Sequence, residues 1–293
     1  MKKPLFTGAC TALVTPFLEG RINYPMMDHL LKRQIDAGIK AVVIAGTTGE
    51  SPTLSDEEKL TLVRRCKGYV GNRCMIIAGT GSNNTAHSVA LSVAAEEAGA
   101  DALLVVSPYY NKATPQGIYL HYLSICNAVS IPVIVYNVPG RTGLDIPVSV
   151  YSQLASISNI AGVKEASNDI TKIIRIRHAC GPDFAVWSGN DDQIVPAMAV
   201  GGSGVISVLS NLYPLQTQAM CDAALSGDFK TASNLQCQFL PLIDSLFSEV
   251  NPIPVKAALN ILGYDFGIPR LPLTKMSEDK EKILKNELLK FIK

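Results

Sequence analysis

The sequence predicts an α/β protein folded as a (β/α)8 TIM barrel with a helical appendage at its C-terminal end. Apolar, β-branched runs recur along the chain, and each ends in small or polar residues before a helical pattern begins. There are eight such runs, at residues 9–14, 41–45, 75–78, 102–106, 132–135, 160–163, 184–187 and 204–207. Strands that alternate with helices favour a parallel sheet, and eight of them match a closed barrel. An open doubly wound sheet would suit a Gly-x-Gly-x-x-Gly turn after the first run, which the chain lacks.

Helix signals lie between these runs. Ser55, with Glu58 three residues later, forms a capping box that opens a helix expected to stop at Gly68. The alanine-rich stretch 85–98 predicts another helix, which Gly99 should end. Proline is favoured in the first helical turn, so three further helices are predicted to begin near Pro115, Pro147 and Pro214.

The pattern changes near residue 226. Residues 227–250, 254–262 and 277–292 predict helices with no strand between them, and Asn-Pro-Ile-Pro at 251–254 predicts a rigid break. We therefore expect a catalytic barrel over residues 1–226. Residues 227–293 should form a helical region that packs on the barrel or on a neighbouring subunit.

Composition excludes several classes of function. Of the 293 residues, 47% are hydrophobic and 17% are charged, which supplies a large core and argues against disorder. A net charge of +1 gives no electrostatic basis for binding nucleic acid or an anionic membrane. No stretch approaches the ~18 uninterrupted apolar residues of a membrane span. Lys2 and Lys3 are not followed by the apolar segment of a signal peptide, so we expect a cytoplasmic protein.

Cysteines and histidines give no pattern typical of a metal site. The seven cysteines include no Cys-x-x-Cys pair and match no zinc or disulfide framework, which predicts free thiols in a reducing compartment. The four histidines show no His-x-x-x-His or His-x-His spacing. Asp191 and Asp192 are too few ligands to predict a cation site. We expect no metal.

Lys164 follows the sixth apolar run directly. A buried charge is costly unless it is paired, and lysine responds to burial by losing its proton. A neutral amine is a nucleophile that forms Schiff bases with carbonyl compounds. The alternative is a solvated lysine, or one paired with Glu165 or another carboxylate. The run alone favours this alternative, so the other strand ends must decide.

The polar residues after the eight runs should meet at one mouth, because barrel active sites form at the C-terminal ends of the strands. The turn at 46–50 can hold a carboxylate by main-chain donors, or it can be an ordinary β-turn. Tyr136 should lie beside Lys164, where it can transfer protons or simply fill the rim. Arg141 can bind a carboxylate through two hydrogen bonds, or it can be a solvated surface arginine.

Five motifs, taken together, resemble one known family. They are Gly-Thr-Thr-Gly-Glu at 46–50, Ser-Pro-Tyr-Tyr-Asn at 107–111, Tyr-Asn-Val-Pro-Gly-Arg-Thr-Gly at 136–143, Val-Lys-Glu-Ala at 163–166 and Asn-Pro-Ile-Pro-Val-Lys at 251–256. Their types and order resemble the pyruvate-dependent class I aldolases, the family of dihydrodipicolinate synthase and N-acetylneuraminate lyase. The resemblance covers nearly the whole chain.

The resemblance implies how pyruvate would be held. Lys164 matches the lysine that forms an imine with pyruvate. Thr48 and Gly49 match the turn that holds the pyruvate carboxylate. Gly189 and Ile206 match backbone positions that line the pocket.

The resemblance also implies a proton relay and an oligomer. Tyr136 matches the proton-transferring tyrosine, which is linked through Thr47 to Tyr110. In the family, the last tyrosine reaches in from the adjacent subunit of a tight dimer, and two dimers usually pair. The resemblance therefore implies a homotetramer, with a tight dimer as the minimum.

Arg141 separates members of the family. It matches the arginine with which dihydrodipicolinate synthases bind the carboxylate of L-aspartate 4-semialdehyde. Enzymes that cleave a 2-keto-3-deoxy sugar acid or N-acetylneuraminate usually lack the Pro-Gly-Arg-Thr-Gly loop. The loop therefore favours a lyase of lysine and diaminopimelate biosynthesis that condenses pyruvate with this aldehyde to 4-hydroxy-tetrahydrodipicolinate. The imine nitrogen serves as the electron sink, so no metal or organic cofactor is implied. A barrel that only senses a keto acid is a further alternative, which the intact set of site residues disfavours.

The resemblance departs at the allosteric cleft of lysine-inhibited synthases. Ser51, Asn83 and Tyr109 match that cleft, but Lys59 and His87 stand where inhibited members typically have a histidine and a glutamate. A cation in place of a carboxylate should repel the ammonium group of lysine. We expect inhibition by lysine to be weak or absent.

Overall fold

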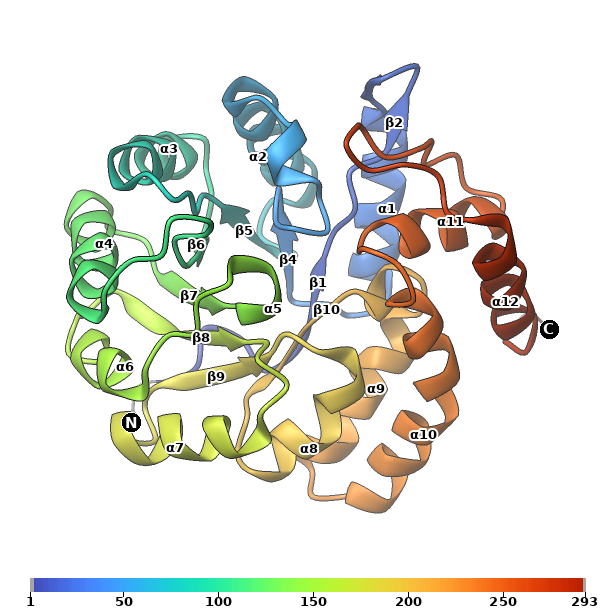
Figure 1. The fold of residues 1–293 in the computed structure, drawn as a ribbon. Coiled ribbons are helices and arrows are strands. Elements are labelled where there is room, and N and C mark those ends of the chain that lie inside the picture. Colours follow the sequence, from blue (N-terminus) through green and yellow to red (C-terminus); the bar gives the residue numbers. More distant parts are fainter. Residues whose placement is uncertain (1–2, 292–293) are drawn as a thin grey trace.

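The computed structural model describes residues 3–291, in which eight parallel strands close into a barrel, as the sequence predicts (Figure 1). Residues 1–2, in the basic start of the chain, and Ile292, predicted to end the last helix, lie outside the described residues. The barrel strands are β1 (Gly8–Ala12), β4 (Ala41–Ile44), β5 (Met75–Gly79), β6 (Ala102–Val106), β7 (Val133–Asn137), β8 (Ile160–Glu165), β9 (Ala185–Ser188) and β10 (Gly204–Ser207). Because β1 pairs with both β4 and β10, the sheet has no free edge.

The predicted runs match the strands to within a few residues, but β7 and β8 are longer than predicted. Each continues through the polar residues that were expected to follow it. Tyr136 pairs in register with Lys164, and Asn137 pairs with Glu165. The expected boundary was wrong because burial, and not the polarity of the side chain, decides where the ladder ends.

Two layers of apolar side chains form the core. Strand residues alternate between the barrel interior and the layer beneath the helices. On β7, for example, Ile134 and Tyr136 face the interior, whereas Val133 and Val135 pack under the helices. Trp187 fills the interior and stacks on Phe6 at a ring-centre distance of 4.7 Å.

The surrounding helices begin largely where the sequence predicts. The capping box of Ser55 and Glu58 is present, with both reciprocal hydrogen bonds. One helix end was predicted wrongly, because α2 passes Gly68 and ends before Gly71. Its buried apolar face continues to Val70, which outweighs the modest cost of a helical glycine. The helices are α1 (Tyr24–Asp36), α2 (Asp56–Val70), α3 (Thr85–Glu97), α4 (Pro115–Ala128), α6 (Val148–Leu154), α7 (Ile170–Cys180), α8 (Ile194–Ala199) and α9 (Pro214–Leu225).

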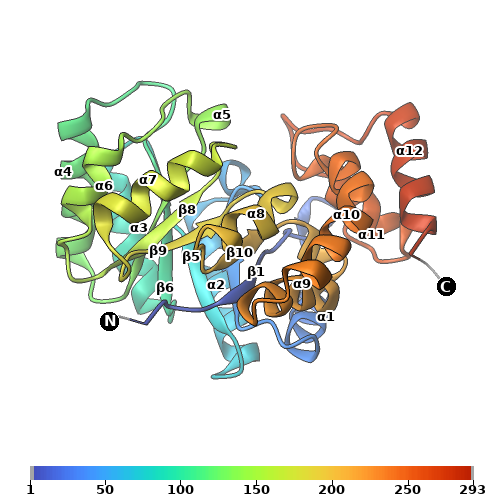
Figure 2. The ribbon, with the colours of Figure 1, turned by 90° about the horizontal axis from the view of Figure 1, so that it is seen from below.

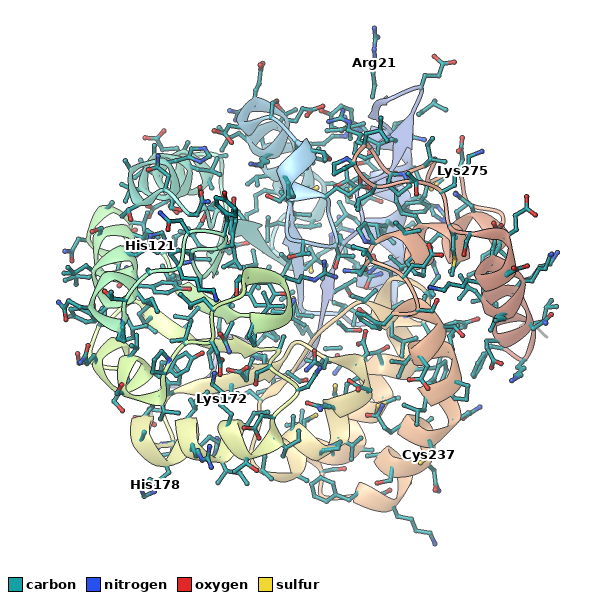
Figure 3. The ribbon with its side chains drawn as sticks, viewed as in Figure 1. Arg21, His121, Lys172, His178, Cys237 and Lys275 are labelled. Carbon is teal, nitrogen blue, oxygen red and sulfur yellow. The ribbon has the colours of Figure 1, made fainter. Side chains whose placement is uncertain are left out.

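Short elements that the sequence analysis did not predict lie at the mouth. β2 (Phe17–Leu18) and β3 (Arg21–Ile22) form a hairpin whose two turn residues, Glu19 and Gly20, both have positive φ. Arg21 projects from this hairpin (Figure 3). α5 (Pro139–Thr142) is a single turn that carries Arg141. Three 3-10 turns complete the set: η1 (Ser51–Thr53), η2 (Asp191–Gln193) and η3 (Leu209–Asn211).

Three helices follow the barrel: α10 (Phe229–Leu246), α11 (Ile253–Ile261) and α12 (Glu278–Leu289). No strand occurs within residues 227–291, and these helices lie to one side of the barrel (Figures 1 and 2). α10 packs against α8 and α9. α11 begins inside the predicted break at 251–254, and the division at residue 226 stays a prediction. Within the described residues, no helix is long and apolar enough to cross a membrane.

His121 is a buried titratable group in this scaffold. It lies on α4 with its side chain 3% exposed (Figure 3). Its Nδ1 lies 2.9 Å from the Thr85 hydroxyl oxygen, and its Nε2 is buried without a hydrogen-bond partner. Burial lowers the pKa of His121 to about 4.

We predict that His121 makes the protein less stable in mild acid. The unfolded chain binds a proton below pH ~6.5, whereas the folded chain excludes it down to about pH 4, so stability falls as pH falls through this range. A shift of this size corresponds to a loss of about 3 kcal/mol. His121→Asn should flatten the pH dependence of the unfolding free energy in urea. His178→Asn, at an exposed position on α7, should keep the wild-type slope (Figure 3). Equal slopes for wild type and His121→Asn would contradict the prediction.

Candidate active site

Lys164 and Tyr136 form the centre of the site. They are register partners on β8 and β7, and the Lys164 amine lies 4.3 Å from the centre of the Tyr136 ring. Lys164 is 5% exposed and Tyr136 is 6% exposed. Gly189 follows β9, and a Cβ atom there would lie 3.0 Å from Cε of Lys164. A glycine at this position therefore leaves room beside the lysine. Ile206, on β10, is fully buried in the barrel interior.

Lys164 differs from the other buried lysines of the chain. Lys172 pairs with Asp145, and Lys256 pairs with Glu50 across 2.7 Å. Among residues 3–291, no carboxylate lies within 4.0 Å of the Lys164 amine. An amine that no carboxylate engages is free to react with a ligand.

Glu165, the neighbour of Lys164, faces the other side of the sheet, so the expected alternative of a Lys164–Glu165 pair does not form. Glu165 accepts hydrogen bonds from the Asn137 amide at 2.9 Å and the Tyr151 hydroxyl at 3.3 Å. Lys172 lies 3.9 Å away, on the side of α7 that faces the barrel (Figure 3). Burial raises the pKa of Glu165, and the nearby Lys172 opposes that shift. Strand alternation thus separates the lysine from its nearest carboxylate in sequence.

The turn at residues 45–50 is a constrained segment. Ala45 and Glu50, the first and last residues of the turn, have φ values of 53° and 60°, a region that non-glycine residues seldom adopt. The Gly49 N–H donates to the Gly46 carbonyl at 3.1 Å. Within the described chain, no protein group accepts a hydrogen bond from the Thr48 N–H. Among the residues that the structure describes, the N–H groups of both Thr47 and Thr48 are without an acceptor, whereas that of Gly49 serves the turn itself.

The C-terminal helical region holds this turn in place. The Asn251 side-chain amide donates to the Thr48 hydroxyl oxygen at 3.0 Å. The Glu50 carboxylate is buried, and it accepts from the Lys256 amine at 2.7 Å and from the Arg270 N–H at 2.8 Å. Burial lowers the pKa of Lys256, and the Glu50 carboxylate opposes that shift. Sequence reasoning assigned no role to Asn251 or Lys256, although the motif at 251–256 had singled out both.

Arg141 lies at the mouth on α5. Its guanidinium is 3.5 Å from the Asn251 carbonyl oxygen, at the long limit of a hydrogen bond. With Thr47 and Tyr136, it lines a cavity of about 290 Å³, which we call the mouth cavity. The structure therefore brings Thr47 together with Tyr136 and Arg141, two predicted site residues that lie far from it in the sequence.

The predicted proton relay is not complete within one chain. Among residues 3–291, no hydrogen bond joins the hydroxyl groups of Thr47, Tyr136 and Tyr110. Tyr110 is 90% exposed and has a φ of 67°. Its ring therefore projects from the loop after β6, away from the rest of the chain.

Asp191 is a buried group near the site that sequence reasoning did not assign. One carboxylate oxygen accepts from the N–H groups of Val208 and Leu209, and the other is buried without a hydrogen-bond partner. Burial raises the pKa of Asp191, whereas Ser207, these N–H groups and the charge of Lys164 lower it. In the part of the chain that the structure describes, no three His, Cys, Asp or Glu residues gather as metal ligands.

Comparison with known proteins identifies the family to which the chain belongs. Its residues 5–290 match the Dihydrodipicolinate synthetase family. The chain belongs to this family. It is 49% identical to the 4-hydroxy-tetrahydrodipicolinate synthase of Acetivibrio thermocellus, over 98% of each sequence. Its fold is similar to that of the dihydrodipicolinate synthase from Aquifex aeolicus, with a TM-score of 0.96, 41% identity and 98% of both chains covered. It is also similar to the chloride-inhibited dihydrodipicolinate synthase from Acinetobacter baumannii complexed with pyruvate, with a TM-score of 0.95 and 40% identity over 97% of this chain and 98% of that one.

The region that resembles the lysine cleft of this family adjoins the mouth cavity, which Ser51, Lys59, His87 and Tyr109 also line. Asp56 joins the two basic side chains, with its oxygens 3.2 Å from the Lys59 amine and 2.7 Å from Nε2 of His87. One carboxylate is therefore shared between two basic groups. Little negative charge is left there to attract an ammonium group.

Proposed function

We propose that this member of the dihydrodipicolinate synthetase family condenses pyruvate with L-aspartate 4-semialdehyde to 4-hydroxy-tetrahydrodipicolinate through a Schiff base on Lys164. The observation that carries the proposal is the buried Lys164 amine, which lies over Tyr136 and has no carboxylate partner among residues 3–291. Full-length similarity to enzymes named for this reaction supports the substrate pair and disfavours a sugar-acid or N-acetylneuraminate lyase.

The proposed reaction begins with attack of the Lys164 amine on the ketone carbon of pyruvate, followed by loss of water to give an imine. The imine withdraws electrons, so the methyl group loses a proton and an enamine forms. The enamine carbon attacks the aldehyde of the second substrate, and the aldehyde oxygen takes up a proton. The amino group of the adduct then displaces Lys164 by transimination, which closes the ring and regenerates the free lysine.

The other site residues receive supporting roles in this proposal. Thr48 binds the pyruvate carboxylate through its hydroxyl and N–H groups, and Gly49 gives the turn its shape. Gly189 leaves space beside the lysine, and Ile206 lines the floor of the pocket. These assignments are supported by the bonding within the turn and by the short approach of residue 189 to Lys164.

Proton transfer is assigned to Tyr136, acting with Thr47 and with Tyr110 of an adjacent subunit. The exposure of Tyr110 supports this arrangement, because its ring is available to a second copy. The proposal therefore includes a homotetramer built from two tight dimers. A cytoplasmic location stays a prediction, supported by the free thiols of all seven cysteines.

The covalent step is tested by reduction. Borohydride added with pyruvate should reduce the imine and attach a stable adduct at Lys164, which peptide mapping by mass spectrometry would locate. Lys164→Ala should form no adduct and lose at least about 10³-fold in turnover, because the covalent route is removed. Lys172→Ala is not a suitable control because it unpairs two carboxylates, so Lys40→Ala, at an exposed position, serves instead. An adduct that still forms in Lys164→Ala would refute the assignment of Lys164 as the lysine that forms the Schiff base.

The second substrate is tested by comparing aldehydes. Wild type should turn over L-aspartate 4-semialdehyde far faster than N-acetylmannosamine or a sugar aldehyde. Arg141→Ala should raise KM for aspartate semialdehyde about 30- to 150-fold, because a charge-assisted pair with its carboxylate is worth about 2–3 kcal/mol. KM for pyruvate should change little. Arg175→Ala, at an exposed site on α7, is the control. Faster turnover of a sugar aldehyde by wild type would favour the rival lyase.

Feedback by lysine should be weak or absent. Steady-state assays with increasing lysine should show no inhibition in the sub-millimolar range, because Lys59 and His87 leave the cleft without a free carboxylate. His87→Glu should increase sensitivity to lysine, and His178→Glu, which makes the same charge change on the outer side of α7, should not. Strong inhibition of wild type by sub-millimolar lysine would refute the prediction.

A further inference from the structure

We infer that Asn251 is a positioning residue for pyruvate, whose side-chain amide makes the Thr48 hydroxyl a hydrogen-bond donor to the keto-acid carboxylate. This inference rests on the proposed function and adds to it a residue from outside the barrel. The contact that carries it is the 3.0 Å hydrogen bond from Asn251 Nδ2 to Oγ1 of Thr48. Both residues are buried, at 6% and 3% exposure, so water competes little for this bond.

The chemistry of the two groups fixes the direction of the bond. A threonine hydroxyl has one hydrogen to donate and two lone pairs that accept. The Asn251 amide nitrogen can only donate, so it occupies a lone pair of Thr48 and leaves the hydroxyl hydrogen unused. That hydrogen, together with the free Thr48 N–H, gives two donors on one residue. Two donors on one residue suit a carboxylate, which accepts hydrogen bonds and carries a full negative charge.

A second contact from the same residue reaches the other substrate site. The Asn251 carbonyl oxygen lies 3.5 Å from the Arg141 guanidinium. This contact is made by the backbone, so replacing the side chain leaves the carbonyl group in place. Substitutions of Asn251 should therefore affect pyruvate more than the aldehyde, which gives the inference a specific kinetic signature.

The unfavourable burial of one polar atom of Asn251 supports a functional role for this residue. Its Oδ1 atom is buried without a hydrogen-bond partner, which is unfavourable for stability. The segment is already anchored close by, through the Lys256–Glu50 ion pair and the bond from Arg270 to Glu50. Packing of the C-terminal region on the turn therefore does not depend on the amide of Asn251.

The experiment measures how pyruvate saturates formation of the borohydride-trapped Lys164 adduct, without the aldehyde. Asn251→Ala should raise the half-saturating pyruvate concentration about tenfold, equivalent to about 1.4 kcal/mol. KM for aspartate semialdehyde should change less than about threefold, because the backbone contact to Arg141 persists. Asn251→Asp keeps the shape of the side chain, but its carboxylate donates no hydrogen bond to Thr48. It should therefore raise the half-saturating pyruvate concentration at least as much as Asn251→Ala does. This variant also provides the test if Asn251→Ala does not fold.

A double-mutant cycle separates this role from a structural one. In a Thr48→Val background, Asn251→Ala should change the half-saturating concentration less than about twofold, because Asn251 acts through the Thr48 hydroxyl. The control is Asn260→Ala, which removes side-chain bonds from α11 to residues 266 and 267 without touching the turn, and it should match wild type. The inference would be overturned if Asn251→Ala raised the half-saturating pyruvate concentration about tenfold both with Thr48 and with Thr48→Val, or in neither background. Failure of wild type to form any adduct would instead overturn the proposed function.

Discussion

Closure of the parallel sheet is the constraint on which the rest of the structure depends. β1 bonds to both β4 and β10, so every strand has two neighbours and every strand ends at the same mouth. Parallel strands buried on both faces need long crossover connections, which are the helices on the outside. Closure therefore converts eight separate strand ends into one ring of side chains. Lys164, Tyr136 and Gly189 become neighbours only for this reason.

The alternation of side chains along β7 and β8 then sorts the polar groups. Tyr136 and Lys164 face the interior, whereas Asn137 and Glu165 face the helices, where Lys172 compensates the carboxylate. A slip of one residue would exchange these sets and bring Glu165 into the site. The register of two strands thus keeps the reactive amine away from the nearest acid.

The helices after the barrel complete the mouth. The C-terminal helical region fixes the 45–50 turn from outside, because the Lys256 amine and the Arg270 main-chain N–H bind Glu50 and the Asn251 side-chain amide binds Thr48. A turn with two non-glycine residues at positive φ is strained, and it persists because its surroundings determine its shape. The appended region therefore acts on the chemistry of the barrel through the geometry of this one turn.

The amino-acid sequence alone predicts the barrel, the order of its strands and the position of Lys164 at a strand end. The periodicity of apolar residues and the residues that follow each apolar run are local signals. They can be read from the sequence without knowledge of the tertiary structure. It did not determine the hairpin at residues 17–22, whose strands have two residues each, or the passage of α2 through Gly68, where the buried face continues to Val70. Tertiary contacts determine which buried lysine has no carboxylate partner within residues 3–291. Lys164, Lys172 and Lys256 are all buried, and the difference lies in carboxylates that approach the latter two from distant parts of the chain.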